Sequence, residues 1–204
     1  MLTLKKFVFG PVEENTYLVY DARGECAIID PGCTTREEQE VLAGFIAAES
    51  ITPKLLLNTH CHFDHVAGNA WVNRTYGLLP QLHVLEKPLL KFAAEAAKLW
   101  GLYIEPYTGN NLTIAGGEVL TLGQHRIELL FTPGHSPGSL SFYFPTEQWV
   151  LSGDVLFELS VGRTDLPGGD YDTLIRSIRE KLFILPDKTK VFSGHGPATT
   201  IGEE

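Results

Sequence analysis

The stretch THCHFDH, residues 59–65, places three histidines and one aspartate within six consecutive positions. It follows a short uncharged apolar run, residues 55–57, which is typical of a strand buried on both faces. On an extended segment the alternate side chains of His60, His62 and Asp64 point to the same side, and His65 is expected to begin the next helix. Four ligand-type groups would then converge, which is more than one tetrahedral metal ion with an open position uses. The stretch therefore predicts two metal ions.

Three further ligand candidates share one local pattern. His135 lies in TPGHSPG, residues 132–138, Asp154 ends the sequence SGD, and His195 stands between two glycines. Each follows a β-rich run and a glycine, so each is expected where a strand meets a loop and the backbone can approach a metal closely. Because α/β proteins gather their sites at strand ends along one sheet edge, we expect these side chains to join residues 59–65.

The composition limits the kind of partner. The chain has 204 residues, of which 44% are hydrophobic and 20% are charged. These proportions predict one soluble globular domain spanning residues 1–204, large enough to bury its own core. The formal net charge is −9, and no basic run is longer than Lys5-Lys6. This argues against a nucleic-acid partner and against binding to an anionic membrane.

The three cysteines are too few and too unevenly spaced for a disulfide framework. No apolar segment reaches the length of a signal peptide core at the amino terminus or of a membrane span elsewhere. We therefore expect a cytoplasmic, soluble protein.

Short strands and helices alternate along the chain in two similar groups, with no linker or repeat between them. This order predicts the α/β class. The spacing of apolar residues, caps and turn residues predicts helices at residues 34–50, 67–76, 87–99 and 171–183, and strands at residues 3–9, 16–20, 26–30, 55–57, 81–85, 119–122, 125–131, 139–144, 149–152 and 191–193.

The ordered motifs THCHFDH, TPGHSPGS, SGD and SGHG resemble those of the metallo-β-lactamase superfamily, and within it those of small glyoxalase-II-like hydrolases. The resemblance covers essentially the whole chain. It implies a four-layer αββα sandwich with two mixed β-sheets and a dinuclear metal site between them. The metal ligands that it implies are His60, His62 and His135 for the first ion, Asp64, His65 and His195 for the second, and Asp154 as the bridge.

The expected cofactors are two divalent metal ions, with zinc favoured and iron or manganese as alternatives. They would lower the pKa of a bridging water from about 15.7 toward about 7, and the resulting hydroxide would be the nucleophile beside the catalytic carboxylates Asp64 and Asp154. The sequence shows no additional general acid, which favours a leaving group that departs without protonation. A thiol with a pKa of about 8.5 is such a group. We therefore predict a small-molecule thioester or related acyl substrate, as for hydroxyacylglutathione hydrolases.

Three residues near these motifs have roles that the sequence leaves open. Asp30 matches an early aspartate that, by the resemblance, orients the metal loop through hydrogen bonds, and it also fits an ordinary Asp-Pro-Gly turn. Arg163 could meet a substrate carboxylate through its planar guanidinium, or it could pair with Asp165 to fix a loop. His83 and His125 lie outside every motif, and we expect them to be structural or solvent-facing.

Other functional classes compete with a thioester hydrolase. By resemblance, mononuclear iron sulfur dioxygenases that act on persulfides use this scaffold with two histidines and one carboxylate, here His60, His135 and Asp154. Lactonases and other ester or amide hydrolases share the fold, while a structural zinc site would be closed and rich in cysteine. The chain differs from full-length glyoxalase II in ending nine residues after His195, where that family continues into a helical domain with basic residues for glutathione.

Overall fold

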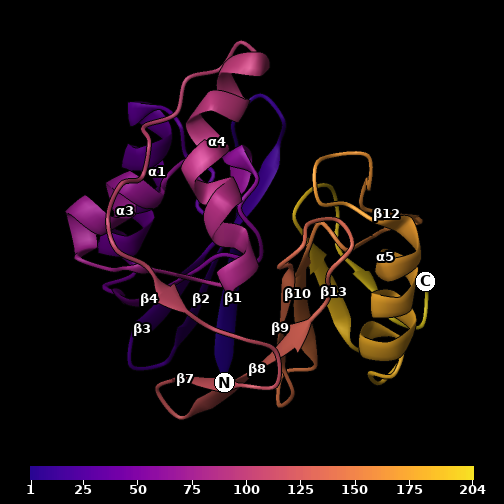
Figure 1. Ribbon diagram of the computed structural model, residues 1–204. Helices are drawn as coiled ribbons and strands as arrows, with labels where there is room; N and C mark the ends of the chain where they lie inside the picture. Colours follow the sequence, from indigo (N-terminus) through magenta and orange to yellow (C-terminus); the bar gives the residue numbers. More distant parts are fainter.

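Two six-stranded mixed β-sheets form the centre of the computed structural model, which describes residues 1–204 (Figure 1). The first sheet has the order β1 (Leu2–Phe9), β2 (Glu14–Asp21), β3 (Glu25–Ile29), β4 (Thr52–Leu57), β5 (Pro80–Leu82) and β6 (Leu112–Thr113). The second has the order β14 (Thr199–Thr200), β13 (Lys190–Ser193), β10 (Trp149–Gly153), β9 (Leu140–Phe144), β8 (His125–Phe131) and β7 (Val119–Leu122). A separate hairpin is formed by β11 (Leu156–Phe157) and β12 (Ser160–Val161).

Helices cover the outer face of each sheet, which gives four layers in the order αββα. α1 (Arg36–Ala48) and α3 (Asn69–Tyr76) pack on the first sheet through Leu42, Ile46 and Val72. α5 (Tyr171–Ser177) and the π-helical turn η2 (Ile178–Leu182) pack on the second. The remaining helical segments are α2 (Phe63–Val66), the 3₁₀ turn η1 (Val84–Glu86) and α4 (Lys87–Leu99). The α/β sandwich expected from the sequence is confirmed.

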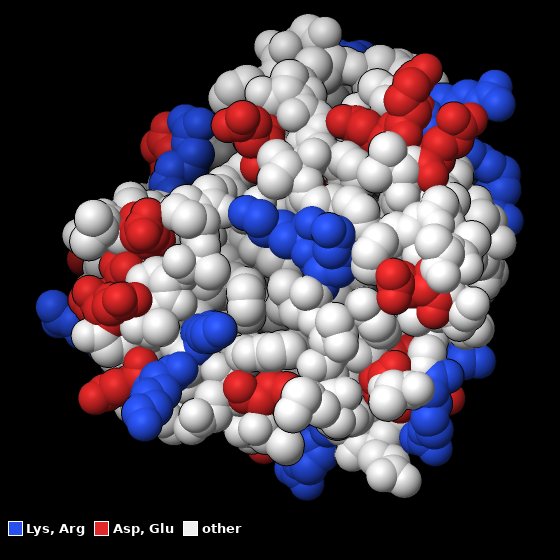
Figure 2. Space-filling view, turned by 180° about the vertical axis from the view of Figure 1, so that it is seen from behind, with Lys and Arg blue, Asp and Glu red and all other residues white.

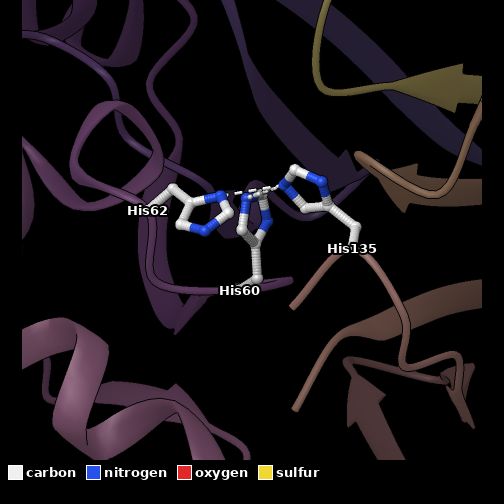
Figure 3. A group of neighbouring side chains, drawn as sticks. All are labelled: His60, His62 and His135. Carbon is white, nitrogen blue, oxygen red and sulfur yellow. Dashed lines mark hydrogen bonds between the residues drawn. The ribbon is translucent and has the colours of Figure 1, made fainter. Parts of the chain in front are cut away.

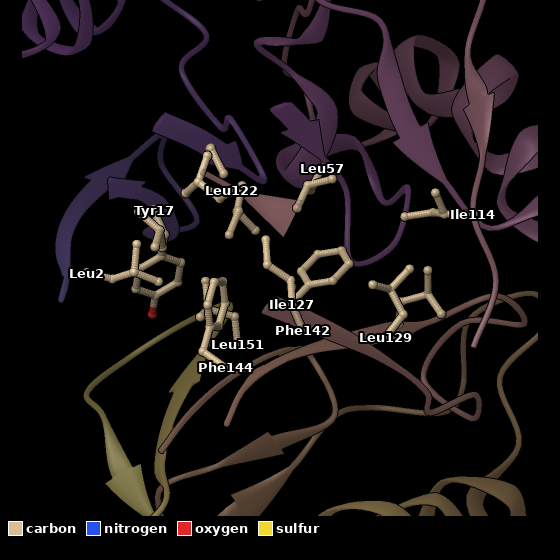
Figure 4. Close-up of a cluster of buried hydrophobic side chains, with 14 residues drawn as sticks. Leu2, Tyr17, Leu57, Ile114, Leu122, Ile127, Leu129, Phe142, Phe144 and Leu151 are labelled. Atoms are coloured by element: carbon tan, nitrogen blue, oxygen red, sulfur yellow. The ribbon is translucent and has the colours of Figure 1, made fainter. Parts of the chain in front are cut away.

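The largest apolar cluster lies between the two sheets and contains 14 buried residues (Figure 4). The strands of the first sheet supply both this cluster and the one beneath the helices, because successive side chains alternate between the faces. In β3, Ala27 and Ile29 face the second sheet, whereas Cys26 and Ile28 face α1 and α3. Both faces of the strand are therefore apolar, as expected for a strand buried on both sides.

Strand directions bring the candidate ligands to one edge of each sheet. β3 and β4 are parallel, so their carboxyl ends lie together, next to Asp30 and residues 59–65. In the second sheet, β8 and β10 are both antiparallel to β9, and β13 is parallel to β10. The carboxyl ends of β8, β10 and β13 consequently meet at one edge, and His135, Asp154 and His195 follow these three strands.

Several local signals in the sequence are confirmed. Thr35 and Glu38 form a complete capping box at the start of α1. Gly77 ends α3 with a φ of 69°, in the left-handed region that glycine adopts without steric cost. Pro88 lies in the first turn of α4, where the missing amide hydrogen has no helical partner to lose.

Three of the predicted elements differ from the structure. The helix expected from His65 begins at Phe63, with His62 as its N-cap, so Asp64 lies on a helix rather than on the extended segment with His60 and His62. The strand expected at residues 81–85 ends at Leu82, because the following residues turn into the 3₁₀ helix η1. The helix expected at residues 171–183 is α-helical only to Ser177 and continues as the π-helical turn η2.

The surface carries no continuous basic area on the face shown in Figure 2, where Lys and Arg side chains are scattered among acidic and uncharged ones. None of the helices combines the length and the apolar character that a membrane crossing requires.

Candidate metal centre

The seven predicted ligands come together between the two halves of the sandwich. His60 and His62 lie in the loop after β4, and Asp64 and His65 lie on α2. The second sheet contributes the remaining three from the ends of β8, β10 and β13, namely His135, Asp154 and His195. Among these seven residues, two groups of three have their ligand atoms within 4.8 Å of one another, and these are His60, His62 and His135, and Asp64, His65 and His195. A third group of this kind joins Asp30 to His60 and His65.

The first group contains three imidazoles and is drawn in Figure 3. The Nε2 atom of His135 lies 2.8 Å from Nδ1 of His62 and 3.2 Å from Nε2 of His60. The rings are nearly perpendicular to one another, so each directs a nitrogen toward the same point instead of stacking. Three converging nitrogens are a common ligand set for zinc.

The second group combines imidazoles with carboxylates. Oδ2 of Asp64 lies 3.2 Å from Nε2 of His195 and 3.7 Å from Nε2 of His65. Asp154 reaches both groups, because its Oδ1 lies 3.4 Å from His65 Nε2 while its Oδ2 lies 3.6 Å from Nε2 of both His135 and His195. The structure therefore separates Asp64 from the first group and places Asp154 between the two.

The outer nitrogens of the histidines fix the direction in which their lone pairs point. Nδ1 of His135 lies 2.8 Å from the carbonyl oxygen of Arg163, and Nδ1 of His195 lies 3.0 Å from that of Val12. A carbonyl oxygen only accepts, so both Nδ1 atoms donate, and in the neutral imidazole each Nε2 presents a lone pair to the site. The Nε2 atoms of His135 and His60 lie 3.2 Å apart, and two lone pairs at this distance repel each other unless a cation lies between them.

Asp30 orients two of the histidines. Its Oδ1 accepts a hydrogen bond of 2.7 Å from the Thr59 amide, and its Oδ2 accepts one of 2.6 Å from the Thr59 hydroxyl. The same Oδ2 lies 3.0 Å from His65 Nδ1, and Thr59 Oγ1 lies 3.1 Å from His60 Nδ1. Asp30 also has a φ of 48°, a conformation that is uncommon outside glycine. Of the two roles left open by the sequence, these contacts match that of orienting the metal loop.

The ionisation of the site favours a cation. Burial lowers the pKa of His62 to about 4 and that of His60 well below its usual range. Burial acts in the same direction at His65, but the charges of Asp154 and Asp64 outweigh it and raise the pKa of His65. Burial opposes ionisation of Asp154, yet the charge of His65 holds its pKa below the usual range. The first group therefore offers neutral imidazoles, whereas the anionic carboxylates of the second favour protonated His65 and His195. A divalent cation can take the place of those protons, because metal binding releases protons from its ligands.

Two buried atoms of this centre have no hydrogen-bond partner, and these are His65 Nε2 and Asp154 Oδ1. Buried polar atoms are rarely left unpaired, because their desolvation costs about 1–3 kcal/mol each. Both atoms point into the space between the two groups of ligands. They are the atoms that a bound divalent cation would satisfy.

Glycines let the backbone approach these ligands closely. A Cβ atom on Gly194 would overlap Asp154 Oδ1 and would lie 2.6 Å from Cε1 of His65. We expect Gly194→Ala to lower zinc affinity at least about tenfold, because it displaces two ligands at once. Titration against a chromophoric chelator measures this.

Gly44 in α1 provides the matched control, because a Cβ there meets no atom within 4 Å. Gly44→Ala should leave zinc affinity unchanged and raise the free energy of unfolding by about 0.5–1 kcal/mol. Equal zinc affinity in the two alanine variants would show that a Cβ atom at Gly194 does not displace Asp154 and His65.

Glu86 is a buried carboxylate that the sequence analysis missed. Its Oε2 accepts a hydrogen bond of 2.7 Å from the amide of Cys61, which lies between two ligands. Its Oε1 accepts bonds of 2.6 Å from the Ser136 hydroxyl and from the Gly138 amide, in the loop that carries His135. Glu86 therefore ties the metal loop of the first sheet to that of the second, and no motif in the sequence marks it.

Replacing Glu86 by glutamine puts an amide NH₂ group where one of three donors now points. We expect Glu86→Gln to lower zinc affinity by about 10- to 100-fold, since outer hydrogen bonds commonly have effects of that size. Zinc competition titration and thermal unfolding would be measured together. The exposed Glu95 on the neighbouring helix α4 gives the control, and a Glu86→Gln protein with the zinc affinity of Glu95→Gln would refute this role.

Another buried carboxylate, Glu14, also escaped the sequence analysis. It is fully buried, its Oε1 lies 4.0 Å from His65 Nδ1, and the Thr16 hydroxyl donates a 2.7 Å hydrogen bond to its Oε2. Burial raises the pKa of Glu14 well above its usual value.

The remaining candidates lie at the margin of the site. Arg163 forms a two-pronged ion pair with Asp165, with Nε–Oδ1 and Nη2–Oδ2 distances of 2.7 Å. This matches the loop-fixing interpretation, and contact with a substrate stays a prediction. His83 caps η1 and His125 lies 3.1 Å from a carboxylate oxygen of Glu147, so neither joins the ligand groups.

Histidine and carboxylate groups that gather between the sheets of an αββα sandwich define the class of metallo-β-lactamase-like proteins. The chain belongs to the metallo-beta-lactamase superfamily, whose family model matches residues 9–195. A Bacillus subtilis protein named probable metallo-hydrolase YqgX is 39% identical over 97% of this chain and 92% of its own length. The hydroxyacylglutathione hydrolase GloC of Haemophilus influenzae is 38% identical over 94% of this chain and 90% of its own length.

Solved structures share this fold over nearly the full chain. The BLEG-1 B3 metallo-beta-lactamase has a TM-score of 0.91 and 39% identity, covering 99% of this chain and 96% of that one. TTHA1623, solved in a di-iron-bound form, has a TM-score of 0.89 and 40% identity, covering 98% of this chain and 96% of that one.

Proposed function

We propose that this chain is a metal-dependent hydrolase that holds two divalent ions and cleaves thioesters of the hydroxyacylglutathione type. The observation that carries the proposal is the inward direction of the imidazole lone pairs. The outer nitrogens of His135 and His195 donate to carbonyl oxygens, so their inner nitrogens are free to bind metal. The proposed ligands are His60, His62 and His135 for one ion, and Asp64, His65 and His195 for the other, with Asp154 shared.

When bound, two such ions would lower the pKa of a water molecule toward about 7 and polarise the carbonyl of the substrate. Asp30 and Thr59 hold the imidazoles of His65 and His60 in their orientations. Asp64 and Asp154 supply the negative charge that retains the cations between the sheets. Histidines and carboxylates would therefore hold the cations together, and Asp30 and Thr59 fix the direction of two of the imidazoles.

The surroundings favour a thioester over an amide. Apart from the proposed ligands, the titratable residues that line the cavity over the centre are Cys61 and Arg163. Burial raises the pKa of the Cys61 thiol well above its usual value, and Arg163 is held by Asp165. Neither donates a proton readily at neutral pH, and a thiol leaving group needs no donor. The similarity to GloC, a hydroxyacylglutathione hydrolase by name, supports the same substrate class.

Zinc is our first expectation for the metal, because three imidazoles and a carboxylate are common zinc ligands. The similarity to TTHA1623 in its di-iron-bound form favours iron as the alternative. Iron would also suit a mononuclear sulfur dioxygenase with His60, His135 and Asp154 as ligands.

The test of this function compares two reactions of the metal-loaded protein. Thiol release from lactoylglutathione is measured beside oxygen uptake with glutathione persulfide, using zinc-loaded and iron-loaded samples of known metal content. Thiol release without oxygen uptake is the expected result. Oxygen uptake without thiol release would replace the hydrolase by the dioxygenase.

We also propose a small-molecule substrate, with neither a nucleic acid nor a membrane as a partner, and a cytoplasmic location. The formal net charge of −9 and the scattered basic side chains in Figure 2 support the exclusion of these anionic partners.

A further inference from the structure

A cavity of about 690 Å³ opens over the candidate metal centre. Its floor is formed by proposed ligands from both halves, among them His62, Asp154 and His195. Helix α4 forms one wall, and the segment from β11 to residue 167 contributes to the opposite wall. In Figure 1, α4 stands on the side of the first half that faces the second half. The volume lies within the range of about 300–1,000 Å³ that is common for small-molecule sites.

Helix α4 has two apolar faces, and only one of them packs against the rest of the protein. Leu90, Ala93 and Ala97 pack into the buried cluster beneath the helix. A neighbouring face bears Phe92, Ala96 and Leu99 at helical spacing, and Trp100 follows as the C-cap. All four side chains line the cavity.

These cavity-facing groups are open to solvent, since Phe92 is 53%, Leu99 81% and Trp100 56% exposed. Contiguous exposed apolar surface of this kind marks a site for an apolar ligand. The opposite wall is apolar as well, because Phe157, Leu166 and Pro167 contribute to it.

Charge is scarce in this cavity outside the proposed ligands. Arg163 is the single charged lining residue beyond them. Its guanidinium already forms two hydrogen bonds of 2.7 Å to Asp165. The cavity therefore offers no free cation for a multiply anionic group, and an apolar group next to the reacting carbonyl is complementary to it.

We propose that the preferred substrates carry an extended apolar acyl group that lies along the α4 face, with the thioester carbonyl over the metal centre. The inference rests on the proposed thioester hydrolase, and it replaces the small polar hydroxyacyl group and the multiply anionic glutathione of that substrate type by an apolar acyl group on a less charged thiol. Hydrolysis adds one water across the C–S bond and yields a carboxylic acid and a thiol. The small face of Ala96 lies between the larger side chains of Phe92 and Leu99, and it leaves the space in which the acyl chain lies.

The test uses zinc-loaded protein and N-acetylcysteamine thioesters of butanoate, hexanoate and octanoate, which differ only in the acyl chain. We expect kcat/KM to rise about fourfold for each added methylene that becomes buried, or about 15-fold for each step of the series. Hydrolysis of all three esters at the same rate would overturn the inference while leaving the hydrolase intact.

Two variants test where the acyl chain of the substrate lies. Ala96→Phe fills the space between Phe92 and Leu99 and should lower the octanoyl-to-butanoyl ratio of kcat/KM at least tenfold. Ala47→Phe adds the same side chain to an exposed position of α1, outside the cavity, and should keep the wild-type ratio. An unchanged ratio in Ala96→Phe would overturn the placement against α4.

Binding of the product gives a readout that needs no catalysis. Calorimetric titration of the zinc-loaded protein should show octanoate binding about 15-fold more tightly than hexanoate. Phe92→Ser, a change at a half-exposed position that spares the core, should weaken octanoate binding at least threefold. Equal affinities for the two carboxylates would contradict the inference. Length-dependent binding without hydrolysis of any thioester would support the apolar site and contradict the proposed function.

Discussion

Asp154→Asn is expected to lower kcat/KM for thioester hydrolysis at least about 10³-fold, since removing one member of a catalytic unit commonly costs this much or more. Among the seven predicted ligands, Asp154 is the carboxylate that reaches both groups, with oxygens 3.4 Å from His65 Nε2 and 3.6 Å from Nε2 of both His135 and His195. Asparagine has nearly the same shape but no charge, so it removes the anion that both cations would share. Steady-state kinetics and metal content per chain are measured on the same samples.

The control is Asp172→Asn, which makes the same change at an exposed position of α5. It should retain wild-type kinetics and metal content. An Asp154→Asn protein with kinetics within threefold of Asp172→Asn would show that Asp154 has no part in the reaction.

Removal of the metal ions is expected to lower the melting temperature by about 5–10 °C for each ion lost. An ion present at about 100 times its Kd stabilises the folded state by about 2.7 kcal/mol. One kcal/mol shifts the melting temperature of a chain of this size by about 2–4 °C. The proposed ligands come from both halves of the sandwich, so the ions would join the β4–α2 segment to the ends of β8, β10 and β13.

Differential scanning calorimetry before and after dialysis against a chelator measures this effect, with metal content determined for each sample. The Asp154→Asn variant is the control, because it should bind less metal and respond less to the chelator. An unchanged melting curve after complete metal removal would contradict a site that joins the two halves.

The sequence predicted most of the fold because its strands carry a strong local signal. Residues 55–57 are apolar and uncharged, and in the structure this run ends β4 with Leu56 and Leu57 completely buried. Thr35 and Gly77 mark the ends of two helices through caps that depend only on neighbouring residues. The sites where prediction erred are the ones where tertiary contacts override local preference.

The start of α2 is such a site. Alternation along an extended segment placed Asp64 with His60 and His62, whereas the helix begins at Phe63 and turns Asp64 toward His195. In an α-helix, successive side chains are rotated by about 100° around the axis. A helix that starts two residues earlier therefore turns Asp64 to a different side and gives it a different partner.

The hydrogen-bond partners of the predicted ligands could not be predicted from the sequence, for a different reason. The carbonyl groups of Val12 and Arg163 orient His195 and His135, and every residue carries a carbonyl group. Glu86 joins two metal loops that are 75 residues apart, between His60 and His135, through backbone amides and a hydroxyl. Such contacts depend on how the two sheets pack, and no residue pattern encodes them locally.

The most direct test of this account is the number of metal ions bound per chain at saturation, determined by elemental analysis of the protein after reconstitution with zinc and removal of excess metal. Two ions per chain is the expected result for the wild type, because the predicted ligands form two separate groups of three whose ligand atoms lie within 4.8 Å, with Asp154 between them. A wild-type protein that binds no ion, or that saturates at a single ion, would contradict the dinuclear centre on which the proposed hydrolysis depends.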